Sequence, residues 1–385
     1  MSLLLILVCG AFVLALLHGL MVTAWRSAAE EAFASGPAGS IEIGGVKVRV
    51  LVPVRNGEGT ITAVLQDLHA QHMPREAMEV VVINDHSTDG TMAVLQAMRT
   101  QWPALQVLDL PADHAGKKAA IERGVGAEGP ELILVTDADV RFGPERVATV
   151  VQQWSRSGAH LLLAPVHMIP EGGTLALLQC EEQAALQGAT AGSALQGSPL
   201  LANGANMAFT RTAFREVGGF TGDRWASGDD MTLLARMRRA GRTIGYVADA
   251  RAAVFTRPEP TMRDYFEQRI RWAGKMRAHP GTSGKVLPAV ALLLPWSLLA
   301  LTLPALQLRV GEQLLHTWSM LLFAWAAWAV PVVRMVRGHH RNMGTAPNPV
   351  PHTVLALLWF AAVSPLIALA ALWWRPLWKG RRLKR

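Results

Sequence analysis

Charged residues are scarce in this 385-residue chain, and cysteine is nearly absent. Only 17% of the residues are Asp, Glu, Lys or Arg, whereas average soluble domains carry about 25%. Hydrophobic residues make up 51%, which excludes an intrinsically disordered chain, since disorder requires high charge and low hydrophobicity. The two cysteines, Cys9 and Cys180, are too few for a disulfide scaffold or a cysteine-built zinc site, and they fit a reducing compartment.

The hydrophobic residues are concentrated in four segments with almost no charge. The first, from Leu3 to Trp25, exceeds the ~20 residues that a membrane-crossing helix needs. It lacks the basic N-terminal region of a signal peptide, so we interpret residues 1–25 as a retained anchor. A C-terminal membrane region, 286–375, is predicted to hold two to three spans, drawn from the apolar runs Val286 to Leu308, Leu314 to Val333 and Thr353 to Trp374.

Basic residues beside these segments predict their orientation. Arg26 follows the first segment, and Arg269 and Arg271 precede the second. The positive-inside rule therefore places the domain between them, 44–280, in the cytoplasm. The net charge of +8 is explained by these flanking clusters, which favour lipid headgroups over nucleic acid as the partner.

The fourth apolar segment conflicts with this rule. A full crossing would place the basic C-terminal tail on the outer side of the membrane. Either the segment around Pro365 is irregular, re-entrant or interfacial, which we favour, or the protein breaks the rule. Apart from His18 and His316, the apolar segments lack the ionisable residues that mark transport pathways, which argues against a transporter.

Short strands alternate with helices in the domain between the apolar segments. Strands are predicted at Val46–Val54, Glu79–Ile83, Leu105–Leu110 and Glu131–Val135, and helices at Gly59–Gln71, Asp89–Arg99 and Lys117–Val125. This order predicts βαβ units and a mostly parallel sheet, with ligands bound at the carboxyl ends of the strands. Glycines 124, 126 and 129 match a dinucleotide-binding pattern, but they follow a helix rather than a strand, so we interpret them as a loop.

Acidic residues follow two of the predicted strands. Asp85 follows the second strand, and Asp137 and Asp139 follow the fourth. Two carboxylates one residue apart can share Mg²⁺ or Mn²⁺ with a diphosphate. An isolated Asp-X-Asp is more often a solvated acidic turn, so the spacing alone leaves both interpretations open.

Eight motifs in a fixed order extend over roughly residues 46–280. They are VPVRNGEGTI (52–61), VINDHSTDGT (82–91), HAGKKAAIERG (114–124), TDAD (136–139), GANMAF (204–209), VGGF (217–220), SGDD (227–230) and QRIRW (268–272). Together they resemble the membrane-associated family-2 glycosyltransferases of the ceramide-glucosyltransferase-like or processive type, whose Q-x-x-R-W pattern fits Gln268, Arg271 and Trp272. One departure is SGDD, where many relatives carry Glu-Asp.

The resemblance implies a GT-A-like fold and metal-dependent hexosyl transfer with inversion. It makes Asp230 the general base, with Asp229 beside it, and it places Mg²⁺ or Mn²⁺ on Asp139 and Asp137. The remaining implied contacts are with the nucleotide-diphosphosugar or the acceptor, and they fall to Pro53, Arg55, Asp85, Lys117, Asp137, Gln268, Arg271 and Trp272. The acceptor implied is a lipid in a bacterial inner membrane; the oligomeric state is left open.

Plainer interpretations stand beside these. The two acids of SGDD could cap a helix that begins near Met231, and Arg271 with Trp272 could anchor an amphipathic helix, Thr261–Arg277, on the membrane. Lys117 and Lys118 could be a solvated helix start, and His339–His340 is expected at the surface. The alternative functions are a processive polysaccharide synthase, for which three or four membrane segments are few, and a non-catalytic scaffold, which would be expected to have lost the acids.

Overall fold

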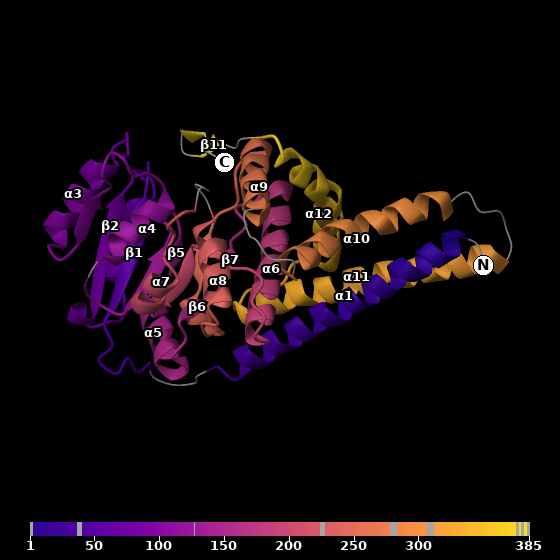
Figure 1. Cartoon of the computed structure of the whole chain (residues 1–385), viewed down its shortest axis with the longest axis horizontal. Helices are drawn as coiled ribbons and strands as arrows, with labels where there is room; N and C mark the ends of the chain where they lie inside the picture. Colours follow the sequence, from indigo (N-terminus) through magenta and orange to yellow (C-terminus); the bar gives the residue numbers. More distant parts are fainter. Residues whose placement is uncertain are drawn as a thin grey trace.

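The protein combines an α/β domain with long helices that project from it (Figure 1). The computed structural model describes residues 3–36, 41–126, 128–223, 228–277, 283–305, 312–374, 377–378 and 381–382. Ser227 of SGDD lies outside these residues, and so does most of the basic C-terminal tail. Between the sheet and the projecting helices lies α6 (Gly173–Leu195), which packs against α1 (Leu3–Ala34), α11 (Glu312–Asn342) and α12 (Val350–Ala370).

The four predicted strands form one half of the main sheet. They are β1 (Val48–Val54), β2 (Met78–Asn84), β3 (Gln106–Asp109) and β4 (Leu132–Thr136), all mutually parallel. The predicted helices between them are α2 (Ile61–His69), α3 (Thr91–Gln101) and α4 (Lys117–Val125). This confirms the predicted βαβ order. Pro53 belongs to β1 itself, opposite Ile83 of β2, rather than to the loop after the strand.

The second half of the sheet is mixed and was not predicted. β8 (Asn206–Thr210) runs antiparallel between β4 and β6 (Leu161–Leu163), and β9 (Ile244–Tyr246) continues the sheet in the order β3-β2-β1-β4-β8-β6-β9. A smaller sheet contains β5 (Arg141–Phe142), β10 (Val254–Thr256) and β7 (Val166–Met168), and a C-terminal pair contains β11 (Leu377–Trp378) and β12 (Arg381–Arg382). The remaining helical elements are η1 (Arg75–Ala77), α5 (Arg146–Ser157), α7 (Arg211–Glu216), α8 (Asp229–Arg239), η2 (Ala250–Ala252), α9 (Met262–Arg277) and α10 (Ser283–Ala305).

Both faces of the main sheet are covered by apolar side chains. Alternate residues of β1 point to opposite faces, so that Val50 and Val52 join one buried cluster and Leu51 joins the other. In β4, Leu134 and Ile133 divide in the same way. Because both faces are buried, these strands are continuous apolar runs, as is typical of parallel sheets.

The glycine pattern that resembles a dinucleotide fingerprint is a loop, as predicted. Helix α4 ends at Val125, and Gly126 takes a left-handed φ of 58° before the chain enters β4. The described residues around this pattern lead from a helix into a strand, and they form no phosphate-binding turn from a strand into a helix.

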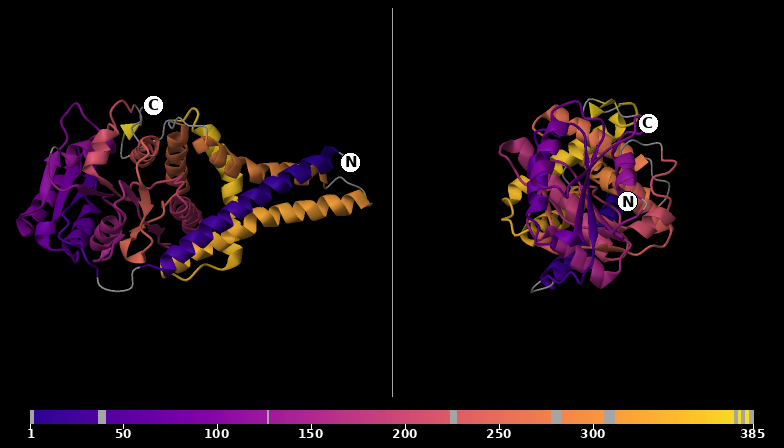
Figure 2. Two further views of the ribbon diagram at one scale, coloured as in Figure 1. Left: turned by 60° about the horizontal axis from the view of Figure 1, so that its bottom comes forward. Right: turned by 90° about the vertical axis from the view of Figure 1, so that its left-hand side faces the viewer.

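Three helices are long and apolar enough to cross a membrane among the described residues: α1, the Leu315–Asn342 part of α11, and α12. α10 contributes a shorter apolar stretch, Leu293–Leu303, and the predicted second segment ends at positions outside the described residues. Figures 1 and 2 show α1 and α11 side by side along the long axis, whereas α12 runs across them beside α6 and α9.

The prediction that the fourth segment is irregular was wrong, whereas its re-entrant or interfacial position stays a prediction. Residues Val350–Ala370 form one continuous helix that includes Pro365. A proline is tolerated within an apolar helix when neighbouring helices and local adjustments satisfy the freed backbone groups, and here α6, α9, α10 and α11 all pack against α12.

The expectation that His339 and His340 lie at the surface was also wrong. Both are buried because α11 continues beyond its apolar part and its last turns pack against α6 and β7. The Nδ1 atom of His167 lies 3.2 Å from the Nε2 atom of His339. The Nε2 atom of His340 lies 3.0 Å from the Oε1 atom of Glu181.

We expect this histidine cluster to make the fold sensitive to acid. Burial, with a smaller contribution from His340, lowers the pKa of His167 to about 4, against about 6.5 in an unfolded chain. Between these values the unfolded chain binds more protons, so the free energy of unfolding should decrease as the pH falls from 6.5 to 4, by up to about 1.4 kcal/mol per unit.

The measurement is the melting temperature in detergent at pH 7.5 and pH 5. His167→Asn should reduce the difference between the two values, whereas His72→Asn, at an exposed position, should leave it as in the wild type. Equal differences in wild type and His167→Asn would contradict this assignment.

Candidate active site

One cavity of about 1330 Å³ contains every predicted site residue. It opens at the carboxyl ends of β1, β2 and β4, faces α9, and extends to α1, α6 and α12. The eleven residues that the sequence singled out and that line it are Pro53, Arg55, Asp85, Lys117, Asp137, Asp139, Asp229, Asp230, Gln268, Arg271 and Trp272. The structure thus brings them together, while their chemical roles stay predictions.

The loops after β1 and β2 form one corner of the cavity around Asp85. The Nη1 atom of Arg55 donates hydrogen bonds to the carbonyl oxygens of Asp85 and His86, both at 2.8 Å. The backbone N–H of Gly116 donates to Oδ2 of Asp85 at 3.0 Å. His86 takes a left-handed φ of 52°, which is uncommon for a residue other than glycine and is often found at functional sites.

A buried ammonium group holds two of the predicted acids. The Nζ atom of Lys117 lies 2.6 Å from Oδ1 of Asp137 and 3.2 Å from Oδ2 of Asp229. Burial alone would lower the pKa of Lys117, but the two carboxylates outweigh it and raise the pKa above its ordinary value. Lys118 pairs with Asp223 at 2.7 Å. The interpretation of both lysines as a solvated helix start was therefore wrong.

Gly204, within GANMAF, allows this close approach. Its carbonyl oxygen accepts a hydrogen bond of 3.0 Å from Nζ of Lys117. A Cβ at this position would lie 2.5 Å from Oδ2 of Asp229 and 2.7 Å from Nζ of Lys117. Any side chain larger than hydrogen would therefore separate the ammonium group from the acid.

Asp230 lies beside this ion pair, in the first turn of α8. Its Oδ2 atom accepts a hydrogen bond from the backbone N–H of Gly204 at 3.3 Å, and its Oδ1 atom accepts one from Met231 at 2.8 Å. Helix α8 begins at Asp229, after Gly228 at the N-cap. The plainer interpretation, in which the two acids cap this helix, was therefore wrong: Gly228 is the N-cap, and both acids lie in the first turn near its positive dipole end, where they also line the cavity.

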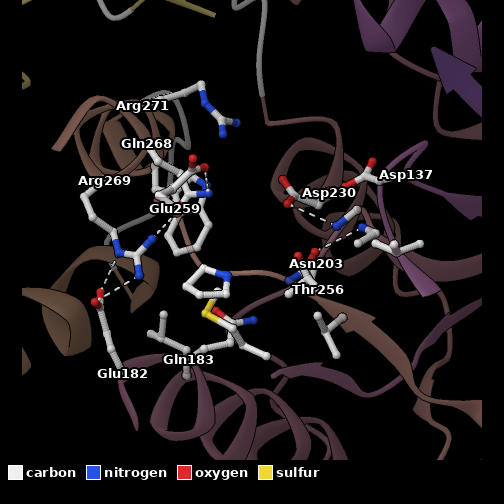
Figure 3. Close-up of a pocket in the computed structure, with 18 of the residues that line it drawn as sticks. Asp137, Glu182, Gln183, Asn203, Asp230, Thr256, Glu259, Gln268, Arg269 and Arg271 are labelled. Carbon is white, nitrogen blue, oxygen red and sulfur yellow. Dashed lines mark hydrogen bonds and ion pairs between the residues drawn. The ribbon is translucent and has the colours of Figure 1, made fainter. Parts of the chain in front are cut away.

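Arg271 projects from α9 towards these acids from the opposite wall, as Figure 3 shows. Burial lowers the pKa of Arg271, and the carboxylates of Asp137 and Glu259 oppose that effect. Within the described part of the chain, no hydrogen bond or ion pair engages its guanidinium group. An arginine in this position can bind a phosphate by two parallel hydrogen bonds.

The sequence analysis missed other polar residues of the cavity, among them Asn203, Glu259, Glu182 and Arg269. The Oδ1 atom of Asn203 accepts a hydrogen bond from Ala205 at 3.0 Å, and Glu259 accepts one from Gln268. Arg269 lies within QRIRW and could have been considered, but Glu182 and Glu259 belong to no motif, so the sequence gives no signal for them.

The acids after β4 fit a hard divalent cation. Asp139 is exposed and Asp137 is partly exposed, and both line the cavity. Among the described residues, no group of three or more His, Cys, Asp or Glu is arranged to hold a metal. Mg²⁺, however, is commonly bound by one or two carboxylates together with substrate phosphates and water.

Comparison with known proteins agrees with this chemistry. The probable glycosyltransferase YdaM of Bacillus subtilis is 26% identical over 235 residues, which cover 59% of this chain and 54% of that protein. Beta-monoglucosyldiacylglycerol synthase of Synechocystis is 30% identical over 106 residues, covering 27% of this chain and 22% of that enzyme. The chain thus spans about half or less of the length of these curated relatives.

The fold has a solved counterpart over nearly the whole chain. Mannosyltransferase PcManGT from Pyrobaculum calidifontis, solved with GDP-Man and Mn²⁺, is 20% identical, with a TM-score of 0.59 over 96% of this chain and 99% of that one. This likeness shows a GT-A-like α/β fold accompanied by three candidate transmembrane helices. Residues 46–275, more than half of the chain, match the family described as glycosyltransferase like family 2. The chain belongs to that family.

Proposed function

We propose that this protein transfers one sugar from a nucleotide-diphosphosugar to a lipid acceptor in the membrane, with inversion at the anomeric carbon. A single observation carries the proposal: one cavity connects the acids and Arg271 with apolar walls on the candidate membrane helices α1 and α12. A soluble acceptor would not need a cavity wall made of such helices.

The apolar arm of the cavity is suited to a lipid. On α1 it is lined by Met21 and Trp25, and on α12 by Phe360, Val363 and Ile367. Burying apolar surface contributes about 25 cal/mol per Å² to binding, so an acyl or isoprenoid chain gains free energy here. The relative that makes glucosyldiacylglycerol supports a lipid acceptor in general, without naming the one used by this chain.

The proposed reaction is a single displacement. The carboxylate of Asp230 removes the proton of the acceptor hydroxyl, whose oxygen attacks the anomeric carbon as the bond to the diphosphate breaks. The nucleoside diphosphate leaves from the opposite face of the sugar, and Arg271 and Lys117 stabilise its charge. Trp272 offers a flat apolar surface for the sugar or the acceptor. Gln268, on the same helix, donates a hydrogen bond to Glu259.

The donor is proposed to lie along the carboxyl ends of β1, β2 and β4. Pro53, Arg55 and Asp85 would contact the nucleoside, and Asp137 with Asp139 would hold Mg²⁺ or Mn²⁺ against the diphosphate. When bound, such a cation would neutralise the leaving group as a Lewis acid. The carboxylate pair is the basis for this proposal.

We propose the same arrangement in the membrane that the sequence predicts. Residues 1–25 would anchor the chain in a bacterial inner membrane, 44–280 would form the cytoplasmic catalytic domain, and 286–375 would form the C-terminal membrane region. The transverse direction of α12 relative to α1 and α11 (Figure 2) supports an interfacial or re-entrant position for it. This arrangement matches the ceramide-glucosyltransferase-like type that the motifs resemble.

The test is a donor and acceptor screen. Detergent-solubilised protein is incubated with labelled nucleotide sugars and a membrane lipid extract, and the lipid fraction is analysed by mass spectrometry. We expect one lipid to gain the mass of one hexose. A ladder of long polymers would overturn single transfer in favour of a polysaccharide synthase. The absence of transfer from every donor, in protein whose melting curve shows it to be folded, would favour a scaffold.

A further inference from the structure

A buried ion pair connects α6 to α9 at the edge of the cavity. The guanidinium group of Arg269 contacts the carboxylate of Glu182 through Nε at 2.9 Å and Nη2 at 3.0 Å. The side chains are only 4% and 8% exposed. A buried pair carries a desolvation cost that its attraction often only offsets, so stability alone does not account for it.

Arg269 also contacts two of the residues proposed to bind substrate. Its guanidinium carbon lies 4.3 Å from the ring centre of Trp272 and 4.7 Å from that of Tyr265, within the distance of a cation–π interaction. It donates a hydrogen bond to Oε1 of Gln268. A single side chain therefore restrains both Gln268 and Trp272.

The pair is connected to the candidate membrane helix α12 as well. The hydroxyl of Tyr265 lies 3.2 Å from Oε2 of Glu182, and Nε1 of Trp359 on α12 donates to that hydroxyl at 3.2 Å. Helices α6, α9 and α12 therefore meet at one polar point, and the rotation of α9 about its own axis is fixed there.

That rotation determines where Arg271 points. Successive residues of an α-helix are about 100° apart, so residues two positions apart lie on nearly opposite faces. Figure 3 shows this outcome: Arg269 turns towards Glu182, and Arg271 turns towards Asp230 and Asp137. Holding Arg269 against α6 therefore presents Arg271 to the acids.

We propose that Glu182 and Arg269 are positioning residues, which hold α9 in the rotation that aims Arg271 at the reacting diphosphate. The proposal rests on the proposed function, because it assigns Arg271 to the donor phosphates. It predicts that Glu182 acts on turnover through Arg271, although the ion pair of Glu182 is with Arg269.

The test is a double-mutant cycle. Glu182→Gln should lower kcat at least about tenfold at saturating donor and acceptor. The Arg271→Lys variant keeps the positive charge but loses the bidentate contact to phosphate. In that background, Glu182→Gln should lower kcat less than about threefold. Such non-additivity is the signature of residues that act together. Arg269→Lys loses the double contact to Glu182 and should lower kcat in the same way as Glu182→Gln. It serves as the second variant if the Glu182→Gln protein does not fold.

Glu181→Gln is the matched control. Glu181 is the preceding residue of α6, its side chain is 1% exposed against 8% for Glu182, and it pairs with His340 of α11 instead of α9. We expect it to lower the melting temperature as much as Glu182→Gln does, while kcat stays within about twofold of wild type. Equal loss of kcat in both variants, or additive losses in the cycle, would overturn the positioning role.

Failure of the positioning role can be distinguished from failure of the proposed lipid transfer. If the wild type transfers sugar to water or to a soluble acceptor but to no lipid, the lipid proposal fails and the cycle is measured with that acceptor. If the wild type transfers to lipid and the cycle is additive, only the positioning role fails.

Discussion

Asp230→Asn is expected to abolish sugar transfer, with a loss of about 10²–10⁴ in kcat, the range of general base catalysis. The carboxylate lies at the first turn of α8 and accepts hydrogen bonds from Gly204 and Met231, so it is oriented before a substrate arrives. An amide cannot accept the proton of the acceptor hydroxyl, but it fills the same space. The nucleotide-diphosphosugar should therefore bind with an affinity within about threefold of wild type, measured by calorimetry.

Asp229→Asn is the appropriate comparison, because SGDD leaves two adjacent acids as candidates. Asp229 lies 3.2 Å from the ammonium group of Lys117, so its carboxylate is held in that ion pair. We expect this variant to weaken donor binding more than it lowers kcat. If Asp229→Asn abolished turnover while Asp230→Asn retained it, the general base would have to be reassigned.

The parallel half of the sheet was predictable because its signal is local. The strands β1, β2 and β4 are apolar runs, acids follow β2 and β4, and helices of ordinary length separate the strands, so periodicity and placement suffice. The mixed half escaped because β6, β7, β9 and β10 have three residues each, too few to show alternation. The antiparallel insertion of β8 between β4 and β6 is a long-range pairing that no local pattern contains.

The residues of the candidate site also fall into those with a local sequence signal and those that depend on long-range packing. Residues in motifs, such as Asp85 and Arg271, were identified because each belongs to a recognisable string. Glu182 was not, since its importance depends on the approach of α6 to α9, which lies 87 positions further along the chain at Arg269. His339 and His340 show the opposite error: their sequence looks solvated, and only the packing of α11 against α6 buries them.

Removal of divalent cations is expected to have the second largest effect. EDTA should lower kcat by at least about 10², because an uncompensated diphosphate is a poor leaving group, and Mn²⁺ or Mg²⁺ should restore it. Asp139→Asn should raise the dissociation constant for Mn²⁺ at least about tenfold in the presence of nucleoside diphosphate, measured by electron paramagnetic resonance. The reason is that Asp139 is one of the two carboxylates proposed to hold the cation, and it lines the cavity at the end of β4.

Asp113→Asn provides the control for this experiment. Its carboxylate is 79% exposed in a loop before α4 and does not line the cavity, so the substitution removes one negative charge without touching the proposed site. Mn²⁺ affinity and kcat should both stay within about twofold of wild type. If instead Asp113→Asn and Asp139→Asn weakened Mn²⁺ equally, the effect would reflect the overall field of the protein. If EDTA left kcat unchanged, the charge of the leaving diphosphate would have to be carried by Arg271 and Lys117 alone.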